Sequence, residues 1–282
     1  MRNMPRMLKE TLKDILTIDE ITKVYSSFDI IGDIIIIKIP DSLLSKKEII
    51  ANTLLKKIKS VNTVFQQISP VQGDYRLRQL EFLAGEEKTI TEYKEHGCIF
   101  KVDVSKTYFS PRLSTERLRI SRLIKDKEVI VNMFGGIGTY SIILAKKTNC
   151  TVHSIDSNPT ATELCLANTK LNRVENRVIP ILGDVAEVIP NKLAGIATRV
   201  LMPLPERAFE FIDLAILALK NKKGIIHFFA HIKSDNKLCS LEEGKKYSNN
   251  VFGSYNSRIV SCRVIREVGP RLYQIVTDIE LF

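Results

Sequence analysis

The sequence predicts an α/β protein in which a largely parallel, doubly wound sheet follows a smaller α+β unit. From Glu128 onward, strand patterns alternate strictly with helical patterns, as expected for parallel strands joined by right-handed crossovers. Before that point, short helical and strand patterns are mixed, which predicts a separate and smaller unit. We therefore expect two domains, at residues 1–108 and 109–282.

The small unit is expected to contain two helices, two strands and a hairpin. His96 and Gly97 form the turn between the two hairpin strands. A basic and aromatic segment that starts at Tyr75, YRLRQLEFLAGE, precedes the hairpin and has no predicted element. The predicted elements are the helices Met7–Leu16 and Lys46–Ile58, the strands Ile34–Ile39 and Asn62–Gln67, and the hairpin strands Lys88–Glu95 and Cys98–Val104.

The large unit begins with a strongly periodic segment, TERLRISRLI, which predicts a helix from Ser114. A series of strands with helices between them follows, and the chain ends in a hairpin whose two runs are separated by Gly269 and Pro270. The predicted strands are Glu128–Met133, Thr151–Asp156, Arg177–Leu182, Arg199–Met202 and Gly224–Phe229, and the hairpin strands are Ser257–Val268 and Arg271–Phe282.

The charge balance favours a polyanionic partner. The chain has 42 Lys and Arg against 32 Asp and Glu, a formal charge of +10, which favours nucleic acid. Its longest apolar runs, such as Ile30–Ile39, contain Gly32 and Asp33 and fall short of the ~20 residues that cross a membrane. The amino terminus lacks the apolar core of a secretory signal. We expect a soluble, cytoplasmic protein, and a monomer.

No metal site is expected. His227 and His231 are four residues apart in GIIHFFAHI, a spacing that imitates a metal site only on a helix, whereas these residues fall in a strand and a following loop. With no third ligand nearby, we interpret them as structural or substrate-adjacent. The five cysteines are scattered without a CxxC pair, which indicates a reducing compartment and no zinc site.

A glycine-rich turn after the first strand of the large unit predicts a cofactor site. In VIVNMFGGIGTYSIILAKK, a buried-strand pattern runs into a turn with Gly135, Gly136 and Gly138, and then into an apolar helix. Residues without a Cβ let the backbone lie against a ligand at the carboxyl end of a strand. The loop lacks both the GxGxxG spacing and the lysine of GxxxxGK[ST], so it favours an adenosyl ligand over a dinucleotide or a nucleoside triphosphate.

Two aspartates end the next two strands. Asp156, 18 residues after Gly138, ends the second strand in HSIDSN, where its carboxylate can bind both ribose hydroxyls. Asp184 ends the third strand in ILGDV, where it can bind an adenine amino group. Either aspartate alone would more often be a helix cap or a turn residue. In this order and spacing after the glycine turn, they favour a nucleoside site.

This arrangement resembles the Rossmann-like class I methyltransferase domain, which implies a seven-stranded sheet with an antiparallel last strand and S-adenosylmethionine as cofactor. The carboxy-terminal hairpin can supply the antiparallel strand. Asn132 departs from the pattern, because many members carry an acidic residue there that contacts the methionine amino group. Its carbonyl oxygen can still accept a hydrogen bond, but without a charge. The resemblance also implies cofactor contacts from Phe134 and Met202.

A second resemblance is more specific. The segment FKVDVSKTYFSPRLSTERLRI resembles the junction motif of the archaeal and eukaryotic tRNA (guanine-37-N1)-methyltransferase family, and the similarity extends from about Val71 to the carboxy terminus. The matching motifs are GDYR (73–76), FSPRLSTER (109–117), MFGGIG (133–138), IDSNP (155–159), GD (183–184) and MPLPERA (202–208). The resemblance implies methyl transfer to N1 of the guanine 3′ of the anticodon, with the anticodon stem-loop of tRNA as the partner.

The resemblance also implies roles for individual residues. Guanine N1 carries a proton at neutral pH, so methylation needs a base and stabilisation of the charge that develops at O6. By similarity, Glu116 is the base and Arg76 is the partner of O6. Arg112 lies four residues before Glu116 and can share its helix face, although such pairs are ordinarily solvated surface ion pairs. The residues assigned to substrate binding are Arg112, Arg117, Tyr108 and Pro205.

The chain departs from the family at two places. Members commonly carry Asn-Leu-Pro after the fourth strand, whereas this chain has Pro203-Leu204-Pro205, and proline cannot make the polar contact of the asparagine. Many members also have an additional amino-terminal domain that recognises the outer corner of tRNA. The small unit occupies the stretch before Val71, so we expect that domain to be lacking and recognition to rest more on the anticodon stem-loop.

Three other functions stay open. An aminocarboxypropyl transferase of the wyosine pathway uses the same cofactor, but a glycine typically follows FSP in that branch, so Arg112 and Glu116 favour methyl transfer. Dual methylation of guanosine and of a wyosine intermediate, imidazoguanosine, is compatible with every motif. A non-catalytic RNA-binding module is favoured by Asn132 and Pro203, and is disfavoured by the intact glycine turn and both aspartates.

Overall fold

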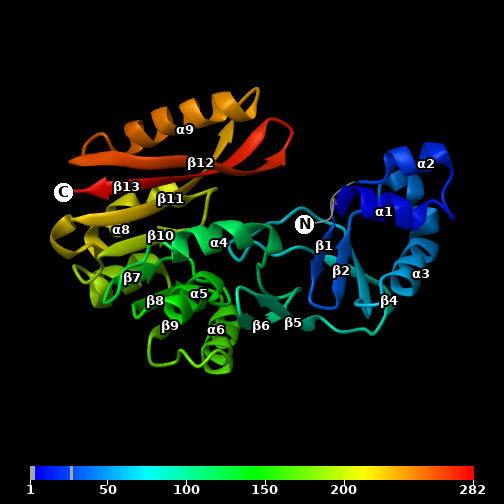
Figure 1. Ribbon diagram of the computed structural model, residues 1–282, viewed down its shortest axis with the longest axis horizontal. Helices are drawn as coiled ribbons and strands as arrows, with labels where there is room; N and C mark the ends of the chain where they lie inside the picture. The colour runs from blue at the N-terminus through cyan, green and yellow to red at the C-terminus, as the bar shows by residue number, and fades with distance from the viewer. Residues whose placement is uncertain (1–3, 26–27) are drawn as a thin grey trace. The chain divides into compact units, whose positions relative to one another are not determined.

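The computed structural model describes residues 4–25 and 28–282 (Figure 1). The chain divides between Arg112 and Leu113 into two units, and each unit has its own hydrophobic core. In the part of the chain that the structure describes, no helix is both long and apolar enough to cross a membrane.

The first unit contains a four-stranded sheet and a separate hairpin. Its elements are α1 (Met4–Leu12), α2 (Ile18–Lys23), β1 (Asp29–Ile31), β2 (Ile34–Ile37), η1 (Asp41–Lys46), α3 (Lys47–Lys57), β3 (Thr63–Gln67), β4 (Leu80–Gly85), and the hairpin strands β5 (Ile90–Glu95) and β6 (Cys98–Asp103). The sheet has the order β1-β2-β3-β4, in which only β2 and β3 are parallel. Leu12 of α1 and Leu54 of α3 pack with Ile35 and Val64 in its core.

Several elements of this unit were not predicted. The six-residue helix α2 begins with a capping box at Thr17 and Glu20 but buries no residue, so no apolar periodicity marks it. The strand β4 lies within the basic and aromatic segment, where most of its residues are only half-buried. The predicted helix Met7–Leu16 instead ends at Leu12, and the predicted helix Lys46–Ile58 begins only after the 3₁₀ turn η1.

The second unit is built on a seven-stranded sheet. Its elements are α4 (Ser114–Ser121), β7 (Val129–Asn132), α5 (Thr139–Lys147), β8 (Thr151–Asp156), α6 (Pro159–Leu171), β9 (Val178–Leu182), α7 (Val185–Val188), β10 (Arg199–Met202), α8 (Ile212–Ala218), β11 (Gly224–Lys233), α9 (Lys237–Phe252), β12 (Ser257–Gly269) and β13 (Leu272–Leu281), with short turns of helix at Ile189–Leu193, Ala208–Phe211 and Lys220–Lys222. The strand order is β12-β13-β11-β10-β7-β8-β9.

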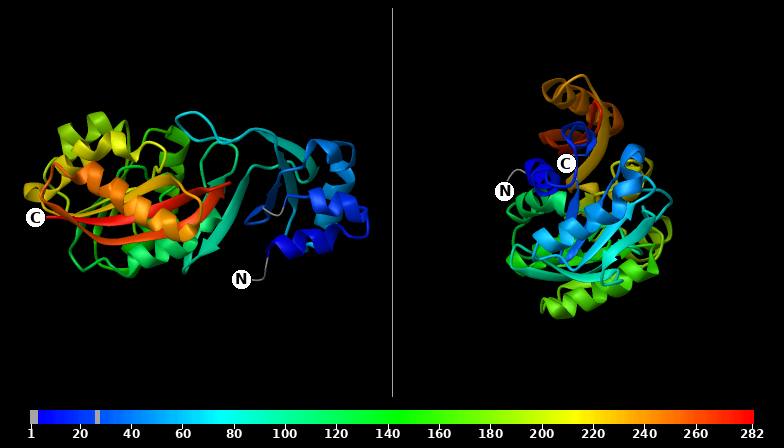
Figure 2. Two further views of the ribbon diagram at one scale, coloured as in Figure 1. Left: turned by 90° about the horizontal axis from the view of Figure 1, so that it is seen from above. Right: turned by 90° about the vertical axis from the view of Figure 1, so that its right-hand side faces the viewer.

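Strands β9, β8, β7, β10 and β11 are parallel, and the terminal hairpin adds β13 antiparallel to β11 and β12 antiparallel to β13. The predicted α/β fold, with seven strands and an antiparallel strand from the hairpin, is confirmed. Figure 2 shows α9 lying along β12 and β13. The strand β11 continues to Lys233, so the expectation that His231 lies in a loop after the strand was wrong.

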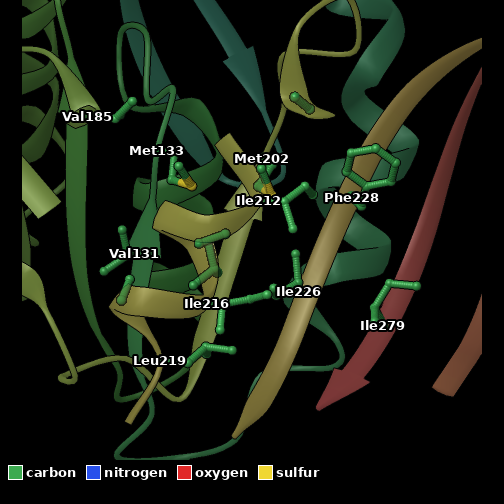
Figure 3. Packing of buried hydrophobic residues seen from close by; sticks show 14 of the residues in the cluster. Val131, Met133, Val185, Met202, Ile212, Ile216, Leu219, Ile226, Phe228 and Ile279 are labelled. Atoms are coloured by element: carbon green, nitrogen blue, oxygen red, sulfur yellow. The ribbon is translucent and has the colours of Figure 1, made fainter. Parts of the chain in front are cut away.

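Successive side chains of β11 point to opposite faces of the sheet, so that Ile226 and Phe228 share one face and His227 and Phe229 share the other. Ile226 and Phe228 belong to a buried cluster with Ile212 of α8 (Figure 3), and the ring of Phe228 contacts that of Phe252 in α9, with 5.5 Å between centroids. His227 lies between these two residues and points to the opposite face. That face also carries Asp278 of β13, whereas the buried pair of Ser248 and Thr277 lies on the face of Phe228.

We predict that Phe228→Ala lowers the free energy of unfolding by about 3–5 kcal/mol, because it leaves a cavity in a core that cannot collapse fully. Urea denaturation followed by circular dichroism measures this change. Phe282→Ala is the matched control, since Phe282 is 52% exposed, and it should change stability by no more than about 0.5 kcal/mol. Equal stabilities of the two variants would contradict the assignment of Phe228 to the core.

Candidate active site

The glycine turn lies between β7 and α5 and is packed tightly on β8. Gly138 is the N-cap of α5 with a φ of 87°, in the left-handed region that favours glycine. A Cβ atom at Gly135 would lie 2.2 Å from Ser154 Oγ and 3.3 Å from the carbonyl oxygen of Ile155. The backbone can therefore approach β8 this closely only because Gly135 has no side chain.

Asp156 ends β8 and binds the glycine turn. Its Oδ2 accepts a hydrogen bond from the Gly136 amide at 2.6 Å, and its Oδ1 accepts one from the Asn158 amide at 2.9 Å. Burial raises the pKa of this carboxyl, and the two amide donors oppose that effect. Asn158 in turn caps α6, so Asp156 connects the turn to the start of the next helix.

The other predicted cofactor residues have structural contacts of their own. Asp184 caps α7 by accepting a hydrogen bond from the Ala186 amide at 2.8 Å, which is the role that an isolated aspartate after a strand most often has. Phe134 packs its ring on that of Phe211, with 5.3 Å between centroids. Met202 is fully buried in the apolar cluster (Figure 3). Cofactor contacts from these three residues stay predictions.

Asn132 ends β7 inside a buried polar row. Its Nδ2 donates to Ser141 Oγ at 3.1 Å, and Ser141 Oγ donates to Ser154 Oγ at 2.9 Å. The side-chain oxygen of Asn132, Oδ1, has no hydrogen-bond partner among the described residues. A buried acceptor without a partner costs about 1–3 kcal/mol. An amino group of a ligand would satisfy it. This acceptor, the glycine turn and the Asp156 carboxylate fit a nucleoside that carries an amino acid.

Glu116 lies on α4 in a row of charged groups that no sequence motif indicated. Arg119 Nε lies 3.0 Å from both carboxylate oxygens of Glu116, and Arg119 Nη1 lies 2.6 Å from Asp278 Oδ2. Asp278 Oδ1 is 2.6 Å from His227 Nδ1, and His227 Nε2 is 2.9 Å from Arg199 Nη1. At the far end, the Arg199 guanidinium binds both carboxylate oxygens of Glu128, at 2.6 and 3.0 Å.

The contact with Arg199 fixes which nitrogen of His227 carries the hydrogen. Arg199 only donates, so His227 Nε2 accepts and His227 Nδ1 donates its hydrogen to Asp278. Burial lowers the pKa of this imidazole, which agrees with the neutral form. Burial alone would raise the pKa of Asp278, but the hydrogen bonds from His227 and Arg119 outweigh it and hold that pKa well below its usual range. For Glu116, burial outweighs the bonds from Arg119, and its pKa is raised.

Arg112 and Glu116 have different partners from the one that their spacing suggested. Arg112 Nε binds Asp29 Oδ1 at 2.9 Å within the first unit, whereas Glu116 binds Arg119. Arg112 lies in a single 3₁₀ turn, Pro111–Leu113, and the α-helix begins only after it. The two side chains therefore do not share one helix face by the three- and four-residue spacing of an α-helix.

Arg76 and Tyr108 come together in the first unit. The guanidinium of Arg76 lies over the ring of Tyr108, 3.9 Å from its centroid. Arg76 has a φ of 54°, an uncommon conformation for a residue with a side chain. Strained backbone of this kind clusters at functional sites, so the turn after Gly73 is a candidate for substrate contact.

Arg117 and Pro205 lie in the second unit. Arg117 is only 2% exposed, and its guanidinium lies over the Tyr140 ring, 5.9 Å from the centroid. Pro205 lines a pocket of about 530 Å³ with Phe209, His231 and Tyr247. Substrate contacts from these residues stay predictions. Within the described part of the chain, no group of three or more His, Cys, Asp or Glu side chains is placed to hold a metal ion.

The parallel sheet with its antiparallel β13, together with the glycine turn and Asp156 at successive strand ends, defines a class I methyltransferase fold. Residues 91–248 match the TRM5/TYW2 methyltransferase domain, and residues 8–89 match the TYW2 N-terminal domain. The chain belongs to the TRM5/TYW2 methyltransferase family. The similarity to the family thus begins at residue 8, whereas the sequence motifs had indicated a similarity only from about Val71.

Individual relatives agree with this membership. The chain is 40% identical over 254 residues to the tRNA (guanine(37)-N(1))-methyltransferase Trm5b of Pyrococcus abyssi, covering 90% of this chain and 74% of that protein. It is 36% identical to the tRNA 4-demethylwyosine(37)-methyltransferase Taw21 of Saccharolobus solfataricus, covering 91% and 94%. The solved complex of aTrm5 and tRNALeu superposes with a TM-score of 0.83 at 34% identity, covering 98% and 78%. The predicted family and enzyme class are confirmed.

We predict that Gly135→Ala destabilises the second unit by about 1–3 kcal/mol, because the new methyl group overlaps Ser154 Oγ. Thermal unfolding measures the change. Gly269→Ala is the control, since the nearest atom to a Cβ there is 3.9 Å away. Adding Ser154→Ala to Gly135→Ala should recover part of the loss. A Gly135→Ala protein as stable as the wild type would refute the close packing.

Proposed function

We propose that this protein transfers the methyl group of S-adenosylmethionine to N1 of guanosine 37 in tRNA. The observation that carries the proposal is Glu116, a buried carboxyl of raised pKa within the motif that the family resemblance assigns to the base. A carboxyl that binds its proton more tightly than usual is better matched to proton transfer near neutral pH. The likeness to Trm5b names the reaction and the position.

The glycine turn, Asp156 and Asn132 would hold S-adenosylmethionine. The Asp156 carboxylate is suited to the ribose hydroxyls, and the buried carbonyl oxygen of Asn132 is suited to the methionine ammonium group. We retain Asp184, Phe134 and Met202 as further contacts on the basis of the resemblance. S-adenosylmethionine supplies the electrophilic methyl group when it is bound.

The chain's own residues supply proton transfer and charge stabilisation. Glu116 accepts the proton of guanine N1, which makes that nitrogen nucleophilic. Arg76 stabilises the negative charge that develops on O6, because a guanidinium is always charged. Tyr108 supports Arg76 through the contact between its ring and the guanidinium. We assign Arg112, Arg117 and Pro205 to substrate binding on the basis of the resemblance.

The partner that this site implies is the anticodon stem-loop of tRNA, in agreement with the formal charge of +10 and with the solved complex of aTrm5 and tRNALeu. We assign residues 1–108 to RNA recognition and residues 109–282 to catalysis. We further infer that the protein acts as a monomer in the cytoplasm.

A second candidate is methylation of 4-demethylwyosine at the same position, alone or in addition to guanosine. The likeness to Taw21, at 36% identity over 94% of that protein, favours it. So does Pro203, which lacks the amide that many guanosine methyltransferases of the family carry. Mass spectrometry of nucleosides, after reaction with tRNA that carries guanosine or 4-demethylwyosine at position 37, separates the two candidates. The added mass also separates methyl from aminocarboxypropyl transfer.

We predict that Asp156→Ala weakens S-adenosylmethionine binding by about 1–3 kcal/mol, through the loss of hydrogen bonds to a charged acceptor. Isothermal titration calorimetry measures the affinity. Asp235→Ala is the matched control, because Asp235 is 82% exposed and pairs only at the surface with Arg271. Unchanged affinity in a folded Asp156→Ala protein would remove Asp156 from the cofactor site.

We predict that Glu116→Gln leaves tRNA and cofactor affinities nearly unchanged and slows methyl transfer by roughly 10²–10⁴-fold, because the amide is isosteric but cannot accept the proton. Arg76→Ala should slow the same step. Single-turnover rates at saturating tRNA and cofactor isolate this step from product release. A Glu116→Gln rate equal to that of the wild type would show that the base lies elsewhere.

A further inference from the structure

We propose that Asp278 is a positioning residue for methyl transfer, because it shares the guanidinium of Arg119 with Glu116 and thereby sets the orientation and basicity of the Glu116 carboxylate. The inference rests on the proposed function, in which Glu116 is the base. It concerns a residue at the carboxy-terminal end of the chain, 162 positions from Glu116, that no motif of the sequence singled out.

The guanidinium of Arg119 is divided between two carboxylates. Its Nε faces both oxygens of Glu116 at 3.0 Å, and its Nη1 faces Asp278 Oδ2 at 2.6 Å. Its Nη2 lies between the two acids, 2.7 Å from Glu116 Oε1 and 3.0 Å from Asp278 Oδ1. All three side chains are largely buried, with 14% of Arg119 and 6% of each acid exposed. A planar fork held on two edges cannot rotate, so it fixes the Glu116 carboxylate.

Asp278 is itself held by the sheet. Its position on β13 is directly opposite His227 on β11 and Ser261 on β12 in the strand registers. His227 Nδ1 donates to Oδ1 at 2.6 Å, and Ser261 Oγ donates to Oδ2 at 2.8 Å. With the bonds from Arg119, each oxygen of Asp278 has two donors. Strands β11, β13 and β12 therefore define where the guanidinium lies, and the guanidinium defines where the Glu116 side chain points.

The same arrangement decides which carboxyl takes up a proton. Glu116 and Asp278 share the single positive charge of Arg119, and His227 is neutral. When both carboxyls are ionised, the buried group of Glu116, Arg119 and Asp278 therefore carries one negative charge in excess. Asp278 has the larger set of donors and keeps its charge, and its pKa is lowered. The pKa of Glu116 is raised by burial and by the charge of Asp278, against the opposing effects of Arg119 and of Arg263 on β12. Asp278 thus makes Glu116 the more basic of the two.

Asp278→Asn tests this inference, because it keeps the shape of the side chain and removes its charge. The charge of Arg119 then acts on Glu116 alone, so we expect the midpoint of the pH–rate profile in single-turnover transfer to fall by about one pH unit. The plateau rate above that midpoint should fall severalfold, since a weaker base accepts the proton less readily. Affinities for tRNA and S-adenosylmethionine should stay within about twofold of the wild type.

Carbon-13 NMR of glutamate-labelled protein gives a readout that does not depend on activity. The Glu116 carboxyl resonance is assigned by its loss in Glu116→Gln, and its titration midpoint should fall in Asp278→Asn by the same amount as the kinetic midpoint. Glu280→Gln is the matched control, because Glu280 lies two residues along β13 in a surface pair with Arg258 at 2.7 Å. It should leave both midpoints unchanged.

The outcomes separate this inference from the proposed function. If the NMR midpoint falls in Asp278→Asn but Glu116→Gln transfers methyl groups at the wild-type rate, the role of Glu116 as the base in the proposed function fails and the influence of Asp278 on Glu116 stands. If Glu116→Gln is slow while Asp278→Asn leaves both midpoints unchanged, the positioning role is overturned. A loss of stability with an unchanged pH profile likewise overturns it, since that is the result for a purely structural ion pair.

If Asp278→Asn does not fold, Arg119→Lys decides the question. An ammonium group keeps the charge but cannot bridge two carboxylates as a planar fork does. We expect the titration midpoint of Glu116 to rise, in the direction opposite to that for Asp278→Asn, and the transfer rate to fall by more than about tenfold. Wild-type values of both quantities would overturn the inference.

Discussion

The antiparallel pairing of β13 with β11 positions much of the second unit. The register runs without interruption from Gly224 opposite Leu281 to Lys233 opposite Leu272, and it sets Asp278 directly opposite His227. Side chains that face each other in such a pair lie on the same side of the sheet. A shift of one residue would turn Asp278 toward the face of Phe228, and His227 and Arg119 would then lose their bonds to the Asp278 carboxylate. The terminal hairpin therefore completes the sheet and also holds Asp278 against Arg119 and His227.

The two faces of the seven-stranded sheet carry different kinds of contacts. On one face, Phe228 and its neighbours form a buried apolar cluster that supplies stability. On the other, α4 and the polar side chains of β11 and β13 carry charge. The glycine turn lies beyond the carboxyl end of β7, where Gly135 packs on β8 and the Gly136 amide donates to the Asp156 carboxylate. The candidate site residues of this unit thus lie at the carboxyl ends of the strands and beside α4, while the cluster around Phe228 resists unfolding.

Sequence patterns predicted the large unit well for a physical reason. Strands buried on both faces, such as β7 and β10, read as continuous apolar runs, and they alternate with helices long enough to be recognised. The small unit was harder because α2 buries nothing and most of β4 is half-buried, so neither has a period. Local motifs likewise led to the prediction of Glu116 as the base and of Asp156 as a cofactor ligand. No sequence motif predicted a role for Asp278, because its contact with Arg119 spans 159 residues and is visible only in the folded structure.

The two arginines in the row that contains His227 prevent proton movement along it. The row from Glu116 to Glu128 has the appearance of a relay, since each group contacts the next. Arginine does not release its proton under any ordinary condition, and Arg119 and Arg199 each interrupt the row. Protons cannot travel along it. Arg119 therefore separates the Glu116 carboxyl from the rest of the row, and any proton that this carboxyl takes up has to leave from its own two oxygen atoms.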